Sequence, residues 1–148
     1  MFKALKSLFS VPVEQGTQIS YQKAVAALMM EVMLADHQVD EKEEQQVKRL
    51  LREVSELGDD IDTLFAEARS GVEQANDLYQ FTKVINETAT LEQKMLLLKG
   101  LWRVALADGD LDAHEDHRIR RISELLFMPH SEFIQAKLFV QKEMRAES

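Results

Sequence analysis

The chain has 148 residues, a typical size for one domain and long enough to bury a core without covalent or metal cross-links. It contains no cysteine, which excludes disulfides, thiolate metal sites and cysteine nucleophiles. Its 26 acidic and 18 basic residues give a net charge of -8, which disfavours binding to nucleic acid and favours cations or basic partners.

The chain is expected to be helical throughout, because apolar residues recur at helical spacing and no alternating strand pattern or hairpin turn is found. The first amphipathic stretch spans about residues 2–9, and a linker with Pro12 and Gly16 follows it. We therefore divide the chain into an N-terminal amphipathic segment with its linker, residues 1–16, and an all-helical domain, residues 17–148.

The N-terminal segment is not expected to be a signal peptide, because Lys6 interrupts its apolar residues and no small-residue cleavage site follows. No apolar run approaches the roughly 18 residues of a membrane span, so we expect no transmembrane segment and a cytoplasmic location. Phe2, Leu5 and Phe9 lie beside two lysines. This segment either packs on the domain or makes a weak contact with a partner or a membrane surface.

The remaining helices are predicted from apolar stripes and from start and stop signals. Gly58 is expected to end a helix, residues 90–93 have the sequence of a capping box, and Pro129 separates the last two helices. Trp102 and the methionines are expected in the core. The predicted fold is a compact all-α bundle of seven or eight helices. Those after residue 16 are expected at 20–35, 41–57, from 59 or 60, at 75–88, from 91, after 112 and after 129.

An internal repeat relates residues 31–50 to residues 103–122 without gaps, at an offset of 72. Seven of the 20 positions are identical, where chance gives about one. Each half is predicted to form a helix–turn–helix unit with an acidic turn, followed by a short turn and a further helix. Such duplicated units often pack about a pseudo-two-fold axis, and the sequence leaves open whether both turns then lie at one end. The identical pairs are Val32/Val104, Leu34/Leu106, Ala35/Ala107, Asp36/Asp108, Asp40/Asp112, Glu43/Glu115 and Arg49/Arg121.

The acidic turns, residues 35–44 and 107–116, contain a pattern that helix capping explains. In each turn an aspartate is followed three residues later by a glutamate, which is the spacing of an N-cap and its reciprocal partner. The pairs are Asp40 with Glu43, and Asp112 with Glu115.

Capping does not explain Asp36 and Asp108, which close helices where the helix dipole disfavours a carboxylate. The compensating group is the next helix's amides, an arginine such as Arg49 or Arg121, or a bound cation. Carboxylates and the free carbonyl oxygens of a helix end make an oxygen shell suited to Ca²⁺ or Mg²⁺. The second turn is not an EF-hand, because alanine and isoleucine stand at its sixth and twelfth positions. The candidate metal ligands are Asp36, Asp40, Glu43, Asp108, Asp110, Asp112 and Glu115.

Two other clusters have surface interpretations. His114 and His117 have a spacing that zinc sites use, but the first repeat has lysine and glutamine at those positions, so exposed histidines are the preferred interpretation. Arg118, Arg120 and Arg121 point in different directions on one helix and are expected to form surface ion pairs rather than a phosphate site.

Residues 106–115 read Leu-Ala-Asp-Gly-Asp-Leu-Asp-Ala-His-Glu, and residues 34–43 repeat the pattern with His37 in place of glycine. A chain with two such turns resembles the bacterial tellurite-resistance protein B (TerB-like) family, over roughly residues 20–140. The resemblance implies a compact all-α fold and a stress-related role. It also implies metal binding at Asp36, Asp40, Glu43, Asp108, Asp112 and Glu115.

The second turn is predicted to bind a cation more tightly than the first. It has Gly109 and Asp110 where the first has His37 and Gln38, and glycine adopts backbone geometries that histidine adopts less readily.

The predicted function is a non-enzymatic, cation-binding interaction module of a bacterial stress response, with an unidentified protein partner. A metal-dependent hydrolase that uses the same acidic residues is one alternative. A metal-free scaffolding domain is the other. The chain has no phosphate-binding glycine loop, no Glu-x-x-His pair and no serine in a nucleophile motif.

Overall fold

The computed structural model describes residues 21–35, 41–54, 61–74, 78–107, 109 and 111–147. Over these ranges the chain is all-α, as predicted, and packs as a helical bundle. The predicted helix at residues 2–9 and the division at residue 16 lie outside the described residues. The helices are α2 (Tyr21–Met33), α3 (Glu41–Val54), α4 (Ile61–Gln74), α5 (Tyr79–Thr88), α6 (Leu91–Ala105), α7 (Ala113–Leu125) and α8 (His130–Glu147).

Capping hydrogen bonds and backbone geometry define the start of α6 and the end of α7. The capping box predicted for α6 is confirmed: Gln93 N donates to Thr90 Oγ1 at 3.1 Å, and Thr90 N donates to Gln93 Oε1 at 2.8 Å. Helix α7 ends where Phe127 takes a left-handed φ of 59°. Met128 N then donates to Ser123 O at 3.1 Å, which closes the helix in the manner of a Schellman motif.

The core lies between the helices and contains the predicted large side chains. Trp102, Met29, Met30 and Met33 are all at most 2% exposed. Leu91, the first residue of α6, is 62% exposed and lies outside the core.

The helix boundaries confirm the internal repeat. Helix α2 ends at Met33 and α6 at Ala105, while α3 begins at Glu41 and α7 at Ala113. Both pairs differ by 72 positions, the offset found in the sequence. We call α2 to α4 the first unit and α6 to α8 the second unit; α5 connects them.

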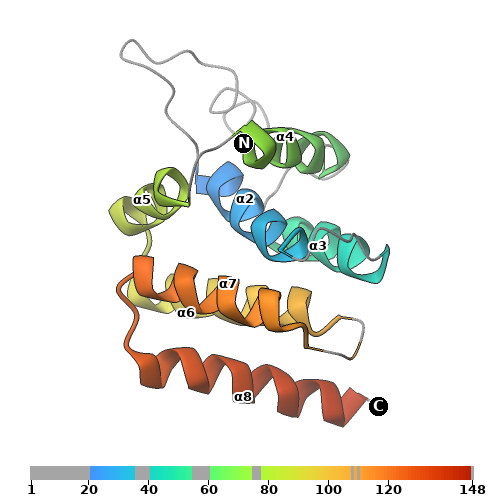
Figure 1. Ribbon diagram of the computed structural model, residues 1–148, viewed down its shortest axis with the longest axis vertical. Helices are drawn as coiled ribbons and strands as arrows, with labels where there is room; N and C mark the ends of the chain where they lie inside the picture. Colours follow the sequence, from blue (N-terminus) through green and yellow to red (C-terminus); the bar gives the residue numbers. More distant parts are fainter. Residues whose placement is uncertain are drawn as a thin grey trace.

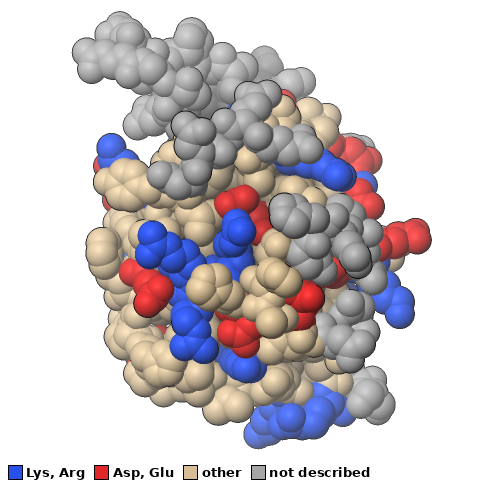
Figure 2. All heavy atoms as spheres, viewed as in Figure 1, with Lys and Arg blue, Asp and Glu red and all other residues tan. Residues whose placement is uncertain are grey.

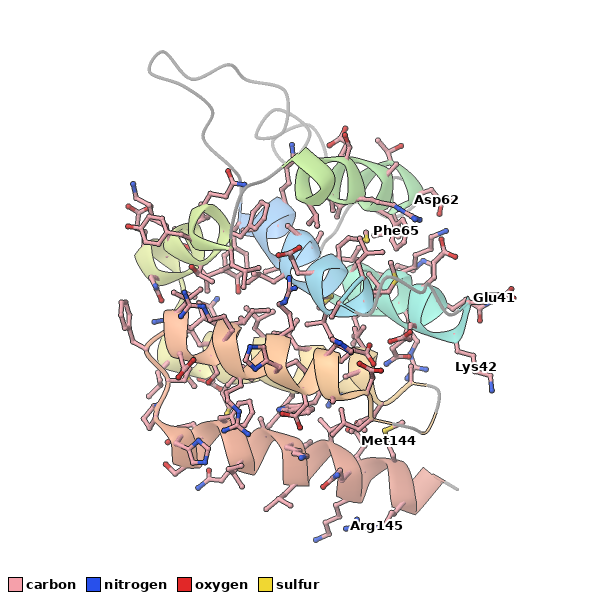
Figure 3. All side chains as sticks on the ribbon, in the orientation of Figure 1. Glu41, Lys42, Asp62, Phe65, Met144 and Arg145 are labelled. Carbon is pink, nitrogen blue, oxygen red and sulfur yellow. The ribbon has the colours of Figure 1, made fainter. Side chains whose placement is uncertain are left out.

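The two units are arranged as a pseudo-two-fold axis requires. Helix α2 packs on α6, and each contact has its counterpart: α2 with α4 and α6 with α8, α2 with α7 and α6 with α3. Figure 1 shows α4 and α8 at opposite ends of the longest axis, with the other helices between them. The start of α3, labelled at Glu41 in Figure 3, and the α6–α7 connection lie on the same side of the molecule.

Each unit also covers an aromatic ring with a basic side chain from its second helix. In the first unit, Lys48 Nζ lies 3.1 Å from Asp62 Oδ1 and 5.0 Å from the ring centroid of Phe65 (Figure 3). In the second unit, Arg120, the counterpart of Lys48, lies 5.0 Å over the ring of Phe133. The two rings do not stand at equivalent positions, because the counterpart of Phe133 is Ile61, so the two contacts are alike in kind but not in place.

Candidate functional site

The second acidic turn, residues 107–116, begins as α6 unwinds. Ala107 N donates to Val104 O at 3.3 Å, and Gly109 N donates to Leu106 O at 3.0 Å. Gly109 has a φ of 91°, a conformation that residues with a side chain rarely adopt. The backbone geometry expected of this glycine is thus confirmed. His37, its counterpart in the first turn, lies outside the described residues.

Asp112 is the N-cap of α7, as predicted. Its Oδ1 accepts from His114 N at 2.7 Å and from Glu115 N at 3.4 Å, and it lies 3.1 Å from His114 Nδ1. Desolvation acts to raise the pKa of the Asp112 carboxyl, but the two N–H donors and the His114 ring outweigh it and hold the pKa below its ordinary value. Asp112 is therefore stabilised as a carboxylate.

Glu43 and Glu115, which follow the two turns at equivalent positions, are buried. Glu43 is 3% exposed and Glu115 is 2% exposed. Gln93 holds the same third position of α6, where it completes a capping box, and it is exposed. Capping therefore does not require burial at this position, and both units bury a carboxylate here, which is costly unless a positive group or donors compensate it.

The structure describes three of the seven predicted ligands: Glu43, Asp112 and Glu115. The others, Asp36, Asp40, Asp108 and Asp110, lie outside the described residues. Within the described ranges, no three histidine, aspartate or glutamate side chains lie close enough together to hold a metal ion. The metal site thus stays a prediction.

The fold and the two turns agree with one known family. The family model described as tellurite resistance protein TerB matches residues 22–138, most of the chain and both acidic turns. The chain belongs to the TerB family. No curated protein and no solved structure matches it. The described helices of this TerB-family chain include none long and apolar enough to cross a membrane.

Two of the three arginines in the basic cluster on α7 of this TerB-family chain form ion pairs, as predicted. Arg118 Nη1 lies 3.1 Å from Glu31 Oε2, and Arg120 Nη2 lies 3.8 Å from Asp116 Oδ1. His114 and His117 are exposed. Figure 2 shows basic and acidic side chains interleaved over the face that α7 and α8 form.

A polar cavity between α3, α6 and α8 was not predicted from the sequence. It includes Arg103, whose Nε and Nη2 donate to Glu143 at 2.8 and 3.0 Å across 40 positions of sequence. A second cavity, between α2, α3 and α6, lies next to it, and for that one a signal was available. Gly100, which lines it, stands where the first unit has Leu28, so the repeat loses a large side chain at this point.

Proposed function

We propose that this TerB-family chain is a non-enzymatic, cation-binding interaction module of a bacterial tellurite-resistance-like stress response. A hard divalent cation, Ca²⁺ or Mg²⁺, binds at the acidic turns. Oxygen ligands from carboxylates and from the carbonyls of a helix end suit both ions.

The burial of Glu43 and Glu115 is the observation that carries this proposal. A solvated, capped turn leaves its third helical residue at the surface, as Gln93 does. Both units bury a carboxylate at equivalent positions in the two acidic turns, where capping alone does not require it. The concentration of carboxylates at these turns favours a cation there.

The second turn is proposed as the tighter site. Gly109 with its φ of 91° allows a sharp backbone turn directly after α6. Asp112 is held in the carboxylate form by N–H donors, so it is available as a ligand through its second oxygen over a wide pH range. Asp110 adds a carboxylate where the first turn has Gln38.

A thermal scan tests the proposal. A cation that binds only the folded chain at 100 times its Kd adds about 2.7 kcal/mol of stability. For a domain of this size that raises Tm by roughly 5–10 °C. The scan compares millimolar Ca²⁺ or Mg²⁺ with a monovalent salt of equal ionic strength. Equal Tm values in the two solutions contradict cation binding and favour the metal-free scaffolding domain.

Variants locate the cation. Glu115→Gln and Asp108→Asn are expected to abolish most of the Tm increase, whereas Asp36→Asn lowers calorimetric affinity less than Asp108→Asn does. Glu92→Gln, an exposed carboxylate at the start of α6, is the matched control and leaves the increase unchanged. A larger affinity loss from Asp36→Asn makes the ranking of the turns wrong. Phosphoesterase turnover by the metal-loaded chain, lost in Glu115→Gln, supports the hydrolase instead.

A further inference from the structure

An apolar cavity of about 350 Å³ lies between α2, α3 and α6. Its inner wall is made of buried side chains from all three helices, while Leu96 at its mouth is 59% exposed. The volume is within the roughly 300–1,000 Å³ of ordinary small-molecule sites. The apolar lining residues are Tyr21, Val25, Met29, Leu50, Leu96, Leu97 and Gly100.

The cavity has a physical origin in the repeat. At the position of Leu28, which is fully buried in the first unit, α6 has Gly100. A Cβ at Gly100 would lie 3.3 Å from Met29 Cε, so the floor of the cavity is the backbone of α6 facing a flexible methionine. Met29 Cε therefore takes up part of the space that a side chain at position 100 would occupy, and both residues line the cavity.

A second, polar cavity of about 340 Å³ adjoins the first, because Leu50 and Arg103 line both. Gln46, Arg49, Glu143 and Met144 complete its lining with Ala107. Met144 projects from the end of α8 toward the α6–α7 connection (Figure 3). The two cavities are therefore neighbours, one apolar and one polar, and we call the pair the groove.

The described side chains that line the polar cavity carry two positive charges, Arg49 and Arg103, and one negative charge, Glu143. Arg103 donates to Glu143 at 2.8 and 3.0 Å. These hydrogen bonds, with the charges of Lys99 and Arg49 nearby, hold the pKa of Glu143 below its ordinary value despite some desolvation. Arg49 is exposed on α3, where a second anion can reach it.

We propose that this groove binds a single-chain amphiphile with a carboxylate head, a free fatty acid in chemical class. The alkyl chain occupies the apolar cavity over Gly100. The carboxylate lies at the polar end, where Arg49 supplies the charge and donor geometry that carboxylates prefer. Charge complementarity distinguishes this ligand from a neutral or cationic amphiphile. The site does not depend on a metal, although its polar end includes Ala107, the first residue of the second acidic turn.

Calorimetric titration of the full-length chain with decanoate, below its critical micelle concentration, tests the proposal. We expect saturable binding at one site per chain. Decyltrimethylammonium, with the same chain and the opposite charge, is expected to bind about tenfold more weakly, and butyrate, with the same head and a short chain, not to bind. Absence of saturable decanoate binding, or equal affinity for the cationic amphiphile, overturns the proposal.

Two variants assign the binding to the groove. Gly100→Leu fills the apolar cavity and is expected to weaken decanoate binding by at least about tenfold, a loss of about 1.4 kcal/mol. Gly71→Leu is the matched control, because Gly71 is helical, in α4, with open space around it. Arg49→Gln, a surface change that leaves the core intact, is expected to weaken binding about fivefold. Unchanged affinity in Arg49→Gln overturns the proposal even if Gly100→Leu fails to fold.

Two other occupants of the groove, the N-terminal segment and a membrane surface, would give different results in binding experiments. If decanoate binds only after residues 1–12 are deleted, the groove belongs to the chain's own N-terminal segment and the proposal is wrong. If the chain sediments with phosphatidylglycerol vesicles and ignores free decanoate, the positive end is a membrane contact and the proposal is wrong. Binding of free decanoate by the intact chain, without vesicle sedimentation, supports it.

Discussion

The first and second units share a helical plan but fill it with different side chains. In the second unit, Trp102 of α6 packs against Phe133 of α8 with ring centroids 5.4 Å apart. The first unit has Met30 and Ile61 at these positions. Both pairs are buried, yet one is aromatic and the other aliphatic. Cores tolerate such exchanges when volume and patterning are kept.

The polar contacts of the two units differ in the same way. Glu31 of α2 pairs with Arg118 of α7, whereas Arg103 of α6 pairs with Glu143 of α8. A buried glutamate in each acidic turn, Glu43 and Glu115, is among the features that both units retain. Packing partners thus differ between the units, whereas these two carboxylates do not.

The largest expected effect comes from the aromatic core of the second unit. Trp102→Ala should lower the free energy of unfolding by about 3–5 kcal/mol, because Trp102 is fully buried and the cavity it leaves is large. Met30→Ala, at the equivalent position, should cost less because it removes fewer atoms. Urea unfolding of both variants measures the difference. A larger loss in Met30→Ala would show that the first unit is the more tightly packed.

Trp102→Phe is the matched control for that comparison. It keeps an aromatic ring next to Phe133 and removes an indole N–H that finds no acceptor among the described residues. We expect it to cost less than half of what Trp102→Ala costs, because no hydrogen bond within the described part of the chain is lost.

The next effect concerns the turns. Gly109→Ala should cost about 1–2 kcal/mol, because alanine is strained at a φ of 91°. Gly71→Ala in α4, where the added methyl meets open space, should instead stabilise by about 0.5–1 kcal/mol. Urea unfolding of both variants separates a glycine required by the turn from one that is not. Equal changes of stability would mean that the turn geometry relaxes without cost.

The helices were predictable because their periodicity is regular, but not every boundary was. Helix α2 was predicted to end at residue 35 and ends at Met33. Helix α5 was predicted from residue 75 and begins at Tyr79. Its N-cap is Leu78, which makes no side-chain cap hydrogen bond, so the usual polar start signal is missing from the sequence. At α6 the signal is present in Thr90 and Gln93, and the predicted start is correct.

The candidate site was predictable only in part. The D-x-x-E spacing identified Asp112 as an N-cap, because capping depends on residues three positions apart. The same spacing does not reveal that Glu115 is buried, since its burial depends on how α7 packs against the other helices. The pair of Arg103 and Glu143 was not predictable either, because it joins residues 40 positions apart.

The smallest predicted effect concerns two ion pairs: Glu31 with Arg118, between the units, and Glu143 with Arg103, within the second unit. We expect the pH dependence of their contributions to stability to have opposite signs. Burial raises the pKa of Glu31, with Arg118 opposing that shift. The hydrogen bonds from Arg103, with the charges of Lys99 and Arg49, lower the pKa of Glu143 despite some desolvation. Ionisation of Glu31 therefore costs the folded state free energy, whereas ionisation of Glu143 stabilises it.

The stability contributed by Glu31 is present below its ordinary pKa of 4.5 and is lost as pH rises through the higher folded-state pKa. The stability contributed by Glu143 is present above the same ordinary value and is lost as pH falls through the lower folded-state pKa. Relative to Glu31→Gln, the natural chain should lose stability as pH rises above 4.5. Relative to Glu143→Gln, it should lose stability as pH falls below 4.5. Both changes should be below about 1 kcal/mol because these pairs are partly solvated.

Urea midpoints on both sides of pH 4.5 measure the two changes of stability, with Glu92→Gln as the control for removing one exposed charge. Parallel curves for the two variants would mean that both pairs experience the same environment, and that the two units differ in side chains but not in electrostatics.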